Sequence, residues 1–187
     1  MSTVLYAFLG GLLPALLWLT FWLMQDRKNP EPLKMLALAF GGGMVAVPLV
    51  LPFEEWIFTT IGGAATVTLT VIILWSLVEE AFKYFAARFL VLGRCSNNEP
   101  LDPIMYMITA ALGFAALENT LFLLDPVTLG NTAQSLFTGN LRFLGATLLH
   151  VLASSMIGLS LALTYYRRGW RRIIGLTIGI IVATALH

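Results

Sequence analysis

Two adjacent glutamates, Glu79 and Glu80, lie in the middle of an apolar stretch, and Lys83 follows one helical turn later. A charged side chain at the centre of a bilayer costs about 2.5–3.5 kcal/mol, so neighbouring carboxylates in such a segment indicate a functional site. Glu79 and Lys83 have the i, i+4 spacing with the acid first, which favours an ion pair on a helix. Glu80 points about 100° away, towards Tyr84, and is expected to be the freer carboxylate.

Four further polar residues interrupt apolar segments, namely Glu118, Asn119, His150 and His187. The three carboxylates against the one ammonium of Lys83 leave two uncompensated negative charges when the histidines are neutral. A site of low dielectric constant does not hold such a charge unassisted. Either carboxyl groups share protons or a divalent cation is bound.

Both solutions to this charge imbalance lead to an activated water molecule. A carboxylate can act as a general base, and a metal ion can lower the pKa of the water that it binds. Histidine and carboxylate side chains are zinc ligands. The candidate ligands for Zn²⁺ are Glu80, Glu118, His150 and His187, and the sequence leaves the choice between metal and shared protons open.

The composition indicates an integral membrane protein. Of the 187 residues, 58% are hydrophobic and 11% are charged, whereas a soluble domain has about 25% charged residues. The net charge of +1 does not indicate a nucleic-acid partner. The single cysteine, Cys95, excludes a disulfide framework and a thiolate metal cluster. We see no internal repeat and interpret residues 1–187 as a single domain embedded in the lipid bilayer.

Apolar runs of about 20 residues predict an all-α, polytopic helical bundle with about six spans. The N-terminal run lacks a basic segment and a small-residue cleavage site, so it is interpreted as a retained span. The expected spans are Thr3–Met24, Leu33–Leu51, a third that begins near Val71, Pro103–Leu124, Leu141–Tyr166 and Ile173–His187.

The stretch between the second and third spans is the least regular part of this map. Pro52–Trp56 is expected to be a short acidic turn in which Glu54 and Glu55 are solvated. The apolar block Ile57–Gly93 is too long for one ordinary span, and its first third is rich in Gly and Thr. We expect this first third to form an interfacial or re-entrant segment that lines the site.

The basic residues predict how the chain is oriented in the membrane. Ten of the 11 Lys and Arg residues fall on one side of the span map, and the positive-inside rule makes that side cytoplasmic. The N-terminus is therefore expected on the extracytoplasmic side of an inner cell membrane. Arg142 is the exception, on the outer side. The ten include Arg27, Lys28 and Lys34 around the first loop, and Arg167, Arg168, Arg171 and Arg172 in the last.

The polar residues of four helices are expected at one depth in the membrane. Glu118 and His187 lie about 22 and 21 Å above the cytoplasmic starts of their spans, at a rise of about 1.5 Å per residue. His150 lies about 14 Å below the outer face, and Glu79 and Glu80 about 12–14 Å below it. In a hydrocarbon core about 30 Å thick, all of them fall in the outer half.

The sequence resembles the PrsW-type intramembrane proteases, which are relatives of the CAAX-processing prenyl endopeptidases and the bacteriocin-immunity membrane proteases. The resemblance covers about Val71 to His187. It rests on four motifs in order, Glu79-Glu80-x-x-Lys83, Phe114-x-x-x-Glu118-Asn119, His150 with Gly158 eight residues later, and His187.

The resemblance implies a helical core in which a glutamate and histidines activate water to cleave peptide bonds. It implies membrane-anchored protein substrates such as anti-sigma factors, cut on the extracytoplasmic side of a prokaryotic inner membrane. By resemblance Glu79 is the general base, whereas helix geometry leaves Glu80 freer, so both stay candidates. His150 and His187 would hold the water or a metal ion, or donate to the oxyanion. Asn119 could supply a neutral oxyanion donor.

One feature departs from the family pattern at the end of the sequence. In this family a further polar residue usually follows the last histidine by about one turn, whereas here the printed sequence ends at His187. A terminal carboxylate at mid-membrane would be costly. We therefore expect the end at His187 to reflect a natural or engineered truncation, and a chain that truly ended there would be expected to lose activity.

Two other functions use the same residue types. Intramembrane Glu, His and Lys also form proton relays, as in a proton-coupled transporter. The lack of the repeat symmetry of carriers and the clustering at one depth argue against this reading. A non-catalytic protein that binds transmembrane segments in the same cavity is the other alternative.

Overall fold

The computed structural model describes residues 3–25, 29–62, 67–128, 137, 139 and 141–187, and every regular element in these ranges is helical. Two of the helices, and the Asp102–Leu124 part of a third, are long and apolar enough to cross a membrane. This agrees with the predicted all-α membrane bundle, while the number of six spans stays a prediction. The elements are α1 (Thr3–Gln25), α2 (Leu33–Ile61), α3 (Leu69–Ala87), the π-helical η1 (Arg88–Leu92), α4 (Asp102–Thr128), the π-helical η2 (Arg142–Ala146), α6 (Thr147–Leu163) and α7 (Trp170–Leu186).

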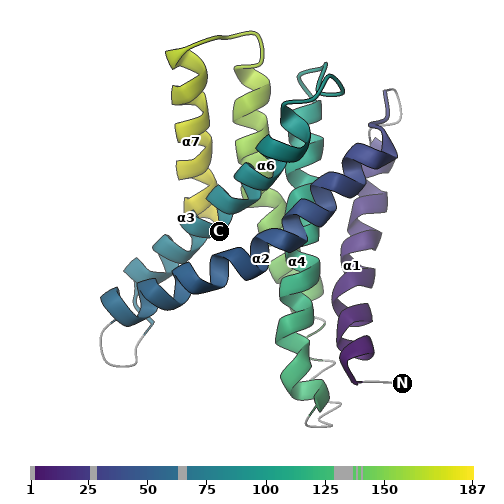
Figure 1. Cartoon of the computed structure of the whole chain (residues 1–187), viewed down its shortest axis with the longest axis vertical. Helices are drawn as coiled ribbons and strands as arrows, with labels where there is room; N and C mark the ends of the chain where they lie inside the picture. Colours follow the sequence, from purple (N-terminus) through teal and green to yellow (C-terminus); the bar gives the residue numbers. More distant parts are fainter. Residues whose placement is uncertain (1–2, 26–28, 63–66, 129–136, 138, 140) are drawn as a thin grey trace.

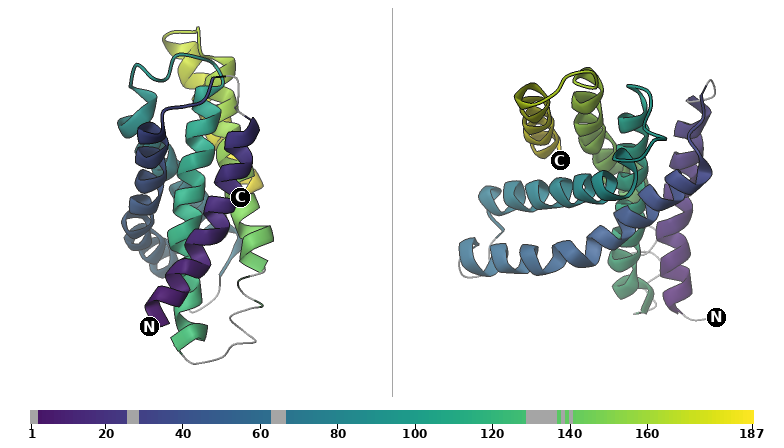
Figure 2. Two further views of the ribbon diagram at one scale, coloured as in Figure 1. Left: turned by 90° about the vertical axis from the view of Figure 1, so that its right-hand side faces the viewer. Right: turned by 45° about the horizontal axis from the view of Figure 1, so that its top comes forward.

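Helix α4 is the centre of the bundle. It packs against α1, α2, α3 and α6, and the left view of Figure 2 shows it between its neighbours. Its residues are apolar on nearly all sides, and those from Met105 to Ala116 are all buried. A helix that is apolar all round is buried on all sides. The polar residues that follow, Glu118 and Asn119, therefore lie next to neighbouring helices.

Helices α2 and α3 form an antiparallel pair that crosses the rest of the bundle. Figure 1 shows both running obliquely across α4, and the right view of Figure 2 shows them side by side, extending beyond α1 and α4. The indole Nε1 of Trp75 donates to the backbone carbonyl of Glu54 over 2.9 Å. The rings of Phe53 and Phe82 pack at 5.3 Å between centroids. These contacts hold the far end of the pair together.

The structure corrects the predicted end of the second span. Helix α2 continues for 29 residues to Ile61, with Pro48 and Pro52 inside it, so Pro52–Trp56 is not a turn. Each proline removes one backbone hydrogen bond, and the contacts with α3 compensate for this loss. The side chain of Glu54 is half-buried as a result, whereas that of Glu55 is exposed as predicted.

The structure also corrects the expected interfacial segment. Residues 57–61 are the last turns of α2, and α3 begins at Leu69, so the described part of this stretch contains no separate interfacial or re-entrant helix. Residues 63–66 lie outside the described residues. The third span begins two residues before the expected Val71, because the Thr68 hydroxyl accepts a hydrogen bond from the Val71 backbone N–H over 3.4 Å and caps the helix.

The crossing of α2 and α4 depends on two glycines. A β-carbon at Gly43 would overlap the backbone of Ala110, and a β-carbon at Gly113 would overlap the backbone of Phe40. Small residues at such a crossing let two helix backbones approach closely. This crossing sets the distance between the carboxylate-bearing end of α4 and the α2–α3 pair.

We expect Gly43→Ala to lower the thermal unfolding midpoint in detergent, because overpacking of this kind costs about 1–3 kcal/mol. Gly41→Ala is the matched control, since nothing lies within 4 Å of its β-carbon position. This control should keep or raise the midpoint, because alanine has the higher helix propensity. Equal midpoints for the two variants would contradict the proposed role of the crossing.

Candidate functional site

The structure brings the ionisable residues singled out in the sequence into one cluster. The cluster lies where α3, α4, α6 and the end of α7 meet. Helix α3 contributes Glu79, Glu80 and Lys83, α4 contributes Glu118, α6 contributes His150, and His187 follows α7.

The ammonium group of Lys83 is at the centre of the cluster. Its side chain has no exposed surface. Its Nζ lies 2.8 Å from Glu80 Oε1, 3.3 Å from Glu79 Oε2 and 2.9 Å from His150 Nδ1. It also lies 4.2 Å from the ring centroid of Phe114, a cation–π contact. The three ammonium hydrogens thus have three polar partners.

The two adjacent glutamates lie in different surroundings. The side chain of Glu80 is fully buried, and its second carboxylate oxygen accepts a hydrogen bond from Ser154 Oγ over 2.7 Å. The expectation that Glu80 is the freer carboxylate is wrong, because the i, i+3 spacing also lets it pair with Lys83. Glu79 keeps 11% of its side chain exposed.

The contacts of His150 define its protonation. Its Nδ1 faces the Lys83 ammonium, which can only donate, so Nδ1 accepts. Its Nε2 lies 2.9 Å from Glu118 Oε2, so Nε2 carries the proton and donates it to the carboxylate. His150 is therefore a neutral imidazole with both nitrogens engaged.

His187 faces the same carboxylates from the end of α7. Its Nε2 lies 3.6 Å from Glu79 Oε2, and its Nδ1 lies 3.5 Å from Glu80 Oε1. Its ring meets that of His150 edge to face at 4.6 Å between centroids. These separations are longer than those of His150, so the His187 ring is held less tightly.

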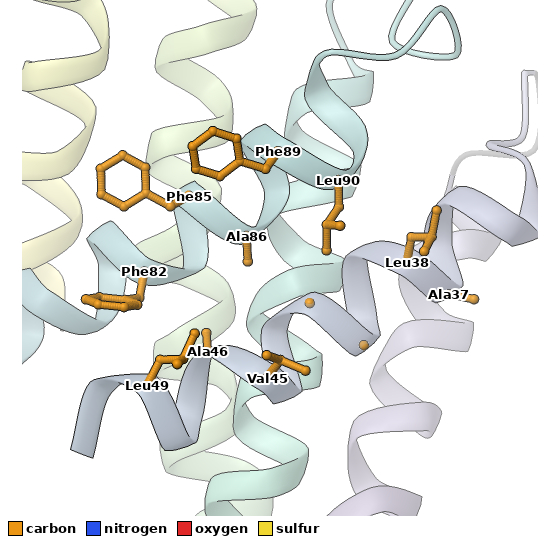
Figure 3. Close-up of a pocket in the computed structure, with 12 residues that line it drawn as sticks. Ala37, Leu38, Val45, Ala46, Leu49, Phe82, Phe85, Ala86, Phe89 and Leu90 are labelled. Atoms are coloured by element: carbon orange, nitrogen blue, oxygen red, sulfur yellow. The ribbon is translucent and has the colours of Figure 1, made fainter. Parts of the chain in front are cut away.

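Three of the described cavities border the α2–α3 pair, and two of them matter for the site. The larger, about 870 Å³, is an apolar groove between α2 and α3, and Figure 3 shows carbon-only side chains such as Phe85 and Val45 along it. The smaller, about 440 Å³, is bounded by α2, α3 and α4. Its lining includes the carboxylates of Glu54, Glu79 and Glu118 among apolar side chains. Of these two, it is the smaller cavity, with Glu79 and Glu118 in its lining, that could bring a polar bond of a substrate to the cluster.

Sequence reasoning missed two residues of this region. Glu54 was interpreted as part of a solvated turn, and it lines the smaller cavity because α2 does not end at Leu51. Arg142 was noted only as the basic residue on the outer side and was given no role, whereas its guanidinium forms an ion pair with Glu118. Its position as the exception to the charge pattern was the signal that could have revealed it.

Asn119 has well-defined partners in the structure. Its Oδ1 accepts a hydrogen bond from Arg142 Nε, and its Nδ2 donates to Thr147 Oγ1 over 3.1 Å. It is not among the residues that line the smaller cavity. These contacts favour a bracing role between α4 and α6 over the predicted oxyanion role.

A group of potential metal ligands lies in the cluster. Glu79, His150 and His187 each offer a ligand atom, and these atoms lie within 4.8 Å of one another. One carboxylate with two imidazoles is a donor set known from catalytic zinc sites. It differs from the set expected from the sequence, because Glu79 takes the place of Glu80 and Glu118.

The arrangement around His150 does not fit a bound metal ion. The Nδ1 lone pair of His150 accepts a hydrogen bond from Lys83. The other ring nitrogen, Nε2, carries the proton that is donated to Glu118. A metal ion would need a free nitrogen lone pair. The donor set can bind a metal ion only after Lys83 moves away from His150.

Residues 31–187 match the sequence profile of a family described as the PrsW family of intramembrane metalloproteases. The chain belongs to this family. The match includes every residue of the cluster, and the predicted resemblance to PrsW-type proteases is confirmed. No solved structure shows significant similarity to the chain.

Curated relatives with the name Protease PrsW share this similarity. The chain is 30% identical to the one from Geobacillus kaustophilus over 115 residues, 62% of this chain and 51% of the relative. It is 26% identical to the one from Bacillus subtilis over 180 residues, 95% of this chain and 78% of the relative. It is 27% identical to the one from Oceanobacillus iheyensis over 116 residues, which are 62% of this chain and 53% of the relative. The chain thus spans about half the length of two of these three relatives.

We expect Lys83→Gln to destabilise the folded chain by about 3–5 kcal/mol, because removal of one partner from a buried ion pair leaves an uncompensated charge. Lys34→Gln is the matched control, since Lys34 is exposed at the start of α2. This control should change the free energy of unfolding by less than about 0.5 kcal/mol. Denaturant unfolding in detergent measures both, and similar small values would show that Lys83 is not the centre of the cluster.

Proposed function

We propose that this chain is an intramembrane endopeptidase that hydrolyses a peptide bond of membrane-anchored protein substrates. Membership of the PrsW family supports the reaction class. The observation that carries the proposal is the position of Glu79. Its carboxylate lines the 440 Å³ cavity, and its Oε2 lies 3.8 Å from His150 Nδ1 and 3.6 Å from His187 Nε2.

Glu79 is the general base in this proposal. It is the glutamate of the pair that lines the cavity, whereas Glu80 is enclosed by Lys83 and Ser154. The carboxylate takes a proton from a water molecule, and the water oxygen attacks the peptide carbonyl carbon. The carbon–nitrogen bond then breaks, and the proton passes from Glu79 to the leaving amine. Glu80 keeps the Lys83 ammonium in place.

The two histidines have different tasks in the same reaction. His150 is held by Lys83 and Glu118, and it fixes the geometry around Glu79. His187 has no contact shorter than 3.5 Å to the two carboxylates. It lies beside Glu79 and, like Asn119, is not among the residues that line the 440 Å³ cavity, so a substrate carbonyl has to pass Glu79 to reach it. With that approach, we assign to His187 the hydrogen bond to the carbonyl oxygen as negative charge develops there.

Carboxylate activation of water, without a metal ion, is the mechanism that the Lys83 contacts support. The ammonium already lies against Glu79 and His150, two of the three potential ligands. The family description names a metalloprotease, and zinc remains the metal that this donor set would bind if Lys83 moved.

The substrates in this proposal resemble anti-sigma factors and are cut near the extracytoplasmic side. The depth of the cluster, counted from the predicted span ends, supports the outer half of the membrane. The positive-inside rule supports an extracytoplasmic N-terminus and an inner-membrane location. Two of the residues behind this orientation, Arg27 and Lys28, lie outside the described residues.

A proton-coupled carrier is the second candidate. The contacts run without a break from Glu118 through His150 to Lys83 and Glu79, as they would in a proton relay. A non-catalytic protein that binds transmembrane segments would use the same cavity. Both alternatives are separated from the protease by the next experiment.

We expect Glu79→Gln to reduce cleavage of a co-expressed single-span protein about 100-fold or more, because a general base contributes at least that factor. Glu55→Gln is the matched control on the exposed side of α2 and should cleave normally. Both variants should melt at similar temperatures in detergent. Full activity of Glu79→Gln would rule out Glu79 as the base. Proton transport by wild-type protein in liposomes, with no cleavage, would support the carrier.

We expect the purified chain to keep its peptidase activity after treatment with a metal chelator. Elemental analysis should find no stoichiometric zinc, because His150 has no free lone pair. One zinc ion per chain that disappears in His150→Ala would overturn the carboxylate mechanism in favour of the metal.

A further inference from the structure

Arg142 is the basic residue that the orientation rule leaves unexplained. The other Lys and Arg residues are placed by the span map on the cytoplasmic side, whereas Arg142 falls on the outer side. In the structure its side chain is only 17% exposed. A lone arginine turned inward at this depth requires partners, because an unpaired charge is costly there.

The guanidinium group of Arg142 contacts three residues on one side of α4. Its Nη2 donates to Glu118 Oε2, and its Nε donates to Asn119 Oδ1. Its Cζ lies 3.9 Å from the ring centroid of Phe122, a cation–π contact. A planar guanidinium can make all three contacts at once, whereas an ammonium cannot reproduce that fork.

A closed set of hydrogen bonds keeps the Arg142 side chain in this position. Asn119 accepts from Arg142 through Oδ1 and donates to Thr147 Oγ1 through Nδ2. Thr147 Oγ1 in turn donates to the backbone carbonyl of Arg142 over 2.9 Å. The set joins α4 to η2 and to the first residue of α6, the helix that carries His150.

Arg142 and His150 meet at a single atom. Glu118 Oε2 accepts from Arg142 Nη2 and also from His150 Nε2. Lys83 makes Nδ1 the acceptor on one side of the ring, and this oxygen holds the Nε2 proton on the other side, so the two contacts together set the tautomer of His150. A carboxylate that accepts the N–H of a histidine in this way fixes both the tautomer and the orientation of the ring.

Arg142 also changes the charge of the cluster. Glu79, Glu80 and Glu118 against Lys83 alone leave two negative charges, and the ion pair of Arg142 with Glu118 reduces this to one. Glu54, which lines the same cavity, is outside this count. Without Arg142, Glu118 would be a partly buried carboxylate without its cation. Its remaining partner among the described contacts would be the neutral His150, through a hydrogen bond.

We propose that Arg142 is a positioning residue, which fixes the Glu118 carboxylate and through it the Nε2–H tautomer and the ring orientation of His150. Its effect on hydrolysis rests on the proposed function. Its effect on His150 does not, and this allows a test that needs no substrate.

The first test reads the histidine ring directly. The chain has two histidines, so ¹⁵N-histidine labelling of the full chain gives ring signals from His150 and His187 alone. Single His→Gln variants assign them. In wild-type protein we expect His150 to show one protonated and one unprotonated nitrogen. In Arg142→Gln we expect the two His150 signals to shift towards each other, as the tautomers mix.

The control for this measurement is Arg172→Gln, which removes an exposed arginine at the start of α7. Its His150 signals should match those of wild-type protein. Unchanged His150 signals in Arg142→Gln would overturn the proposal, because they would show that the ion pair of Arg142 with Glu118 does not influence the protonation of the His150 ring.

The second test uses kinetics. We expect Arg142→Gln to lower kcat about 10- to 100-fold, the range for outer-shell partners of a histidine, with KM nearly unchanged. Because Arg142 acts through Glu118, the double variant Arg142→Gln/Glu118→Gln should have the kcat of Glu118→Gln alone. Independent, additive losses would overturn the proposal.

Arg142→Lys keeps the test decisive if Arg142→Gln does not fold. Lysine retains the positive charge but lacks the forked set of N–H donors of the guanidinium. We therefore expect smaller changes in kcat and in the His150 signals than in the glutamine variant. Wild-type values for both would overturn positioning by the guanidinium. If wild-type protein cleaves no substrate while the His150 signals respond to Arg142→Gln, the proposed function fails and the positioning role stands.

Discussion

The Lys83 ammonium has no exposed surface, and each of its hydrogens faces a polar atom on α3 or α6. Moving an ion out of water costs several kcal/mol unless its partners are held at hydrogen-bond distance. This requirement determines the packing of α3 against α6. It also forces His150 to accept through Nδ1, so that the Nε2 proton points to Glu118.

The same requirement separates two glutamates that are neighbours in the chain. Glu80 satisfies Lys83 and Ser154 in a fully buried position, whereas Glu79 reaches the cavity bounded by α2, α3 and α4. A buried ion pair by itself is weak evidence for stability. In this structure the ion pair serves to position a side chain, because Glu80 and Lys83 together hold the Glu79 carboxylate at the cavity wall.

Much of the site could be predicted from sequence because its signals are local. The spacing of Glu79 and Lys83 on one helix face and the apolar runs both depend on residues within a few turns of each other. The tertiary contacts could not be predicted in this way. Glu54 was missed because Pro52 suggested a turn. Glu80 was judged the freer glutamate because its i, i+3 spacing to Lys83 was not weighed and its hydrogen bond from Ser154 joins residues far apart in the chain.

Composition, hydrophobic length and motif order are enough to indicate the all-helical membrane class, the family and the set of ionisable residues. Which residues of different helices meet depends on the tertiary structure. The close crossing at Gly43 and Gly113 positions α4 against α2, and the path of η2 returns Arg142 to Glu118. Contacts between residues of separate helices depend on where the helices cross, and the positions of these crossings do not appear as a periodic pattern in the sequence.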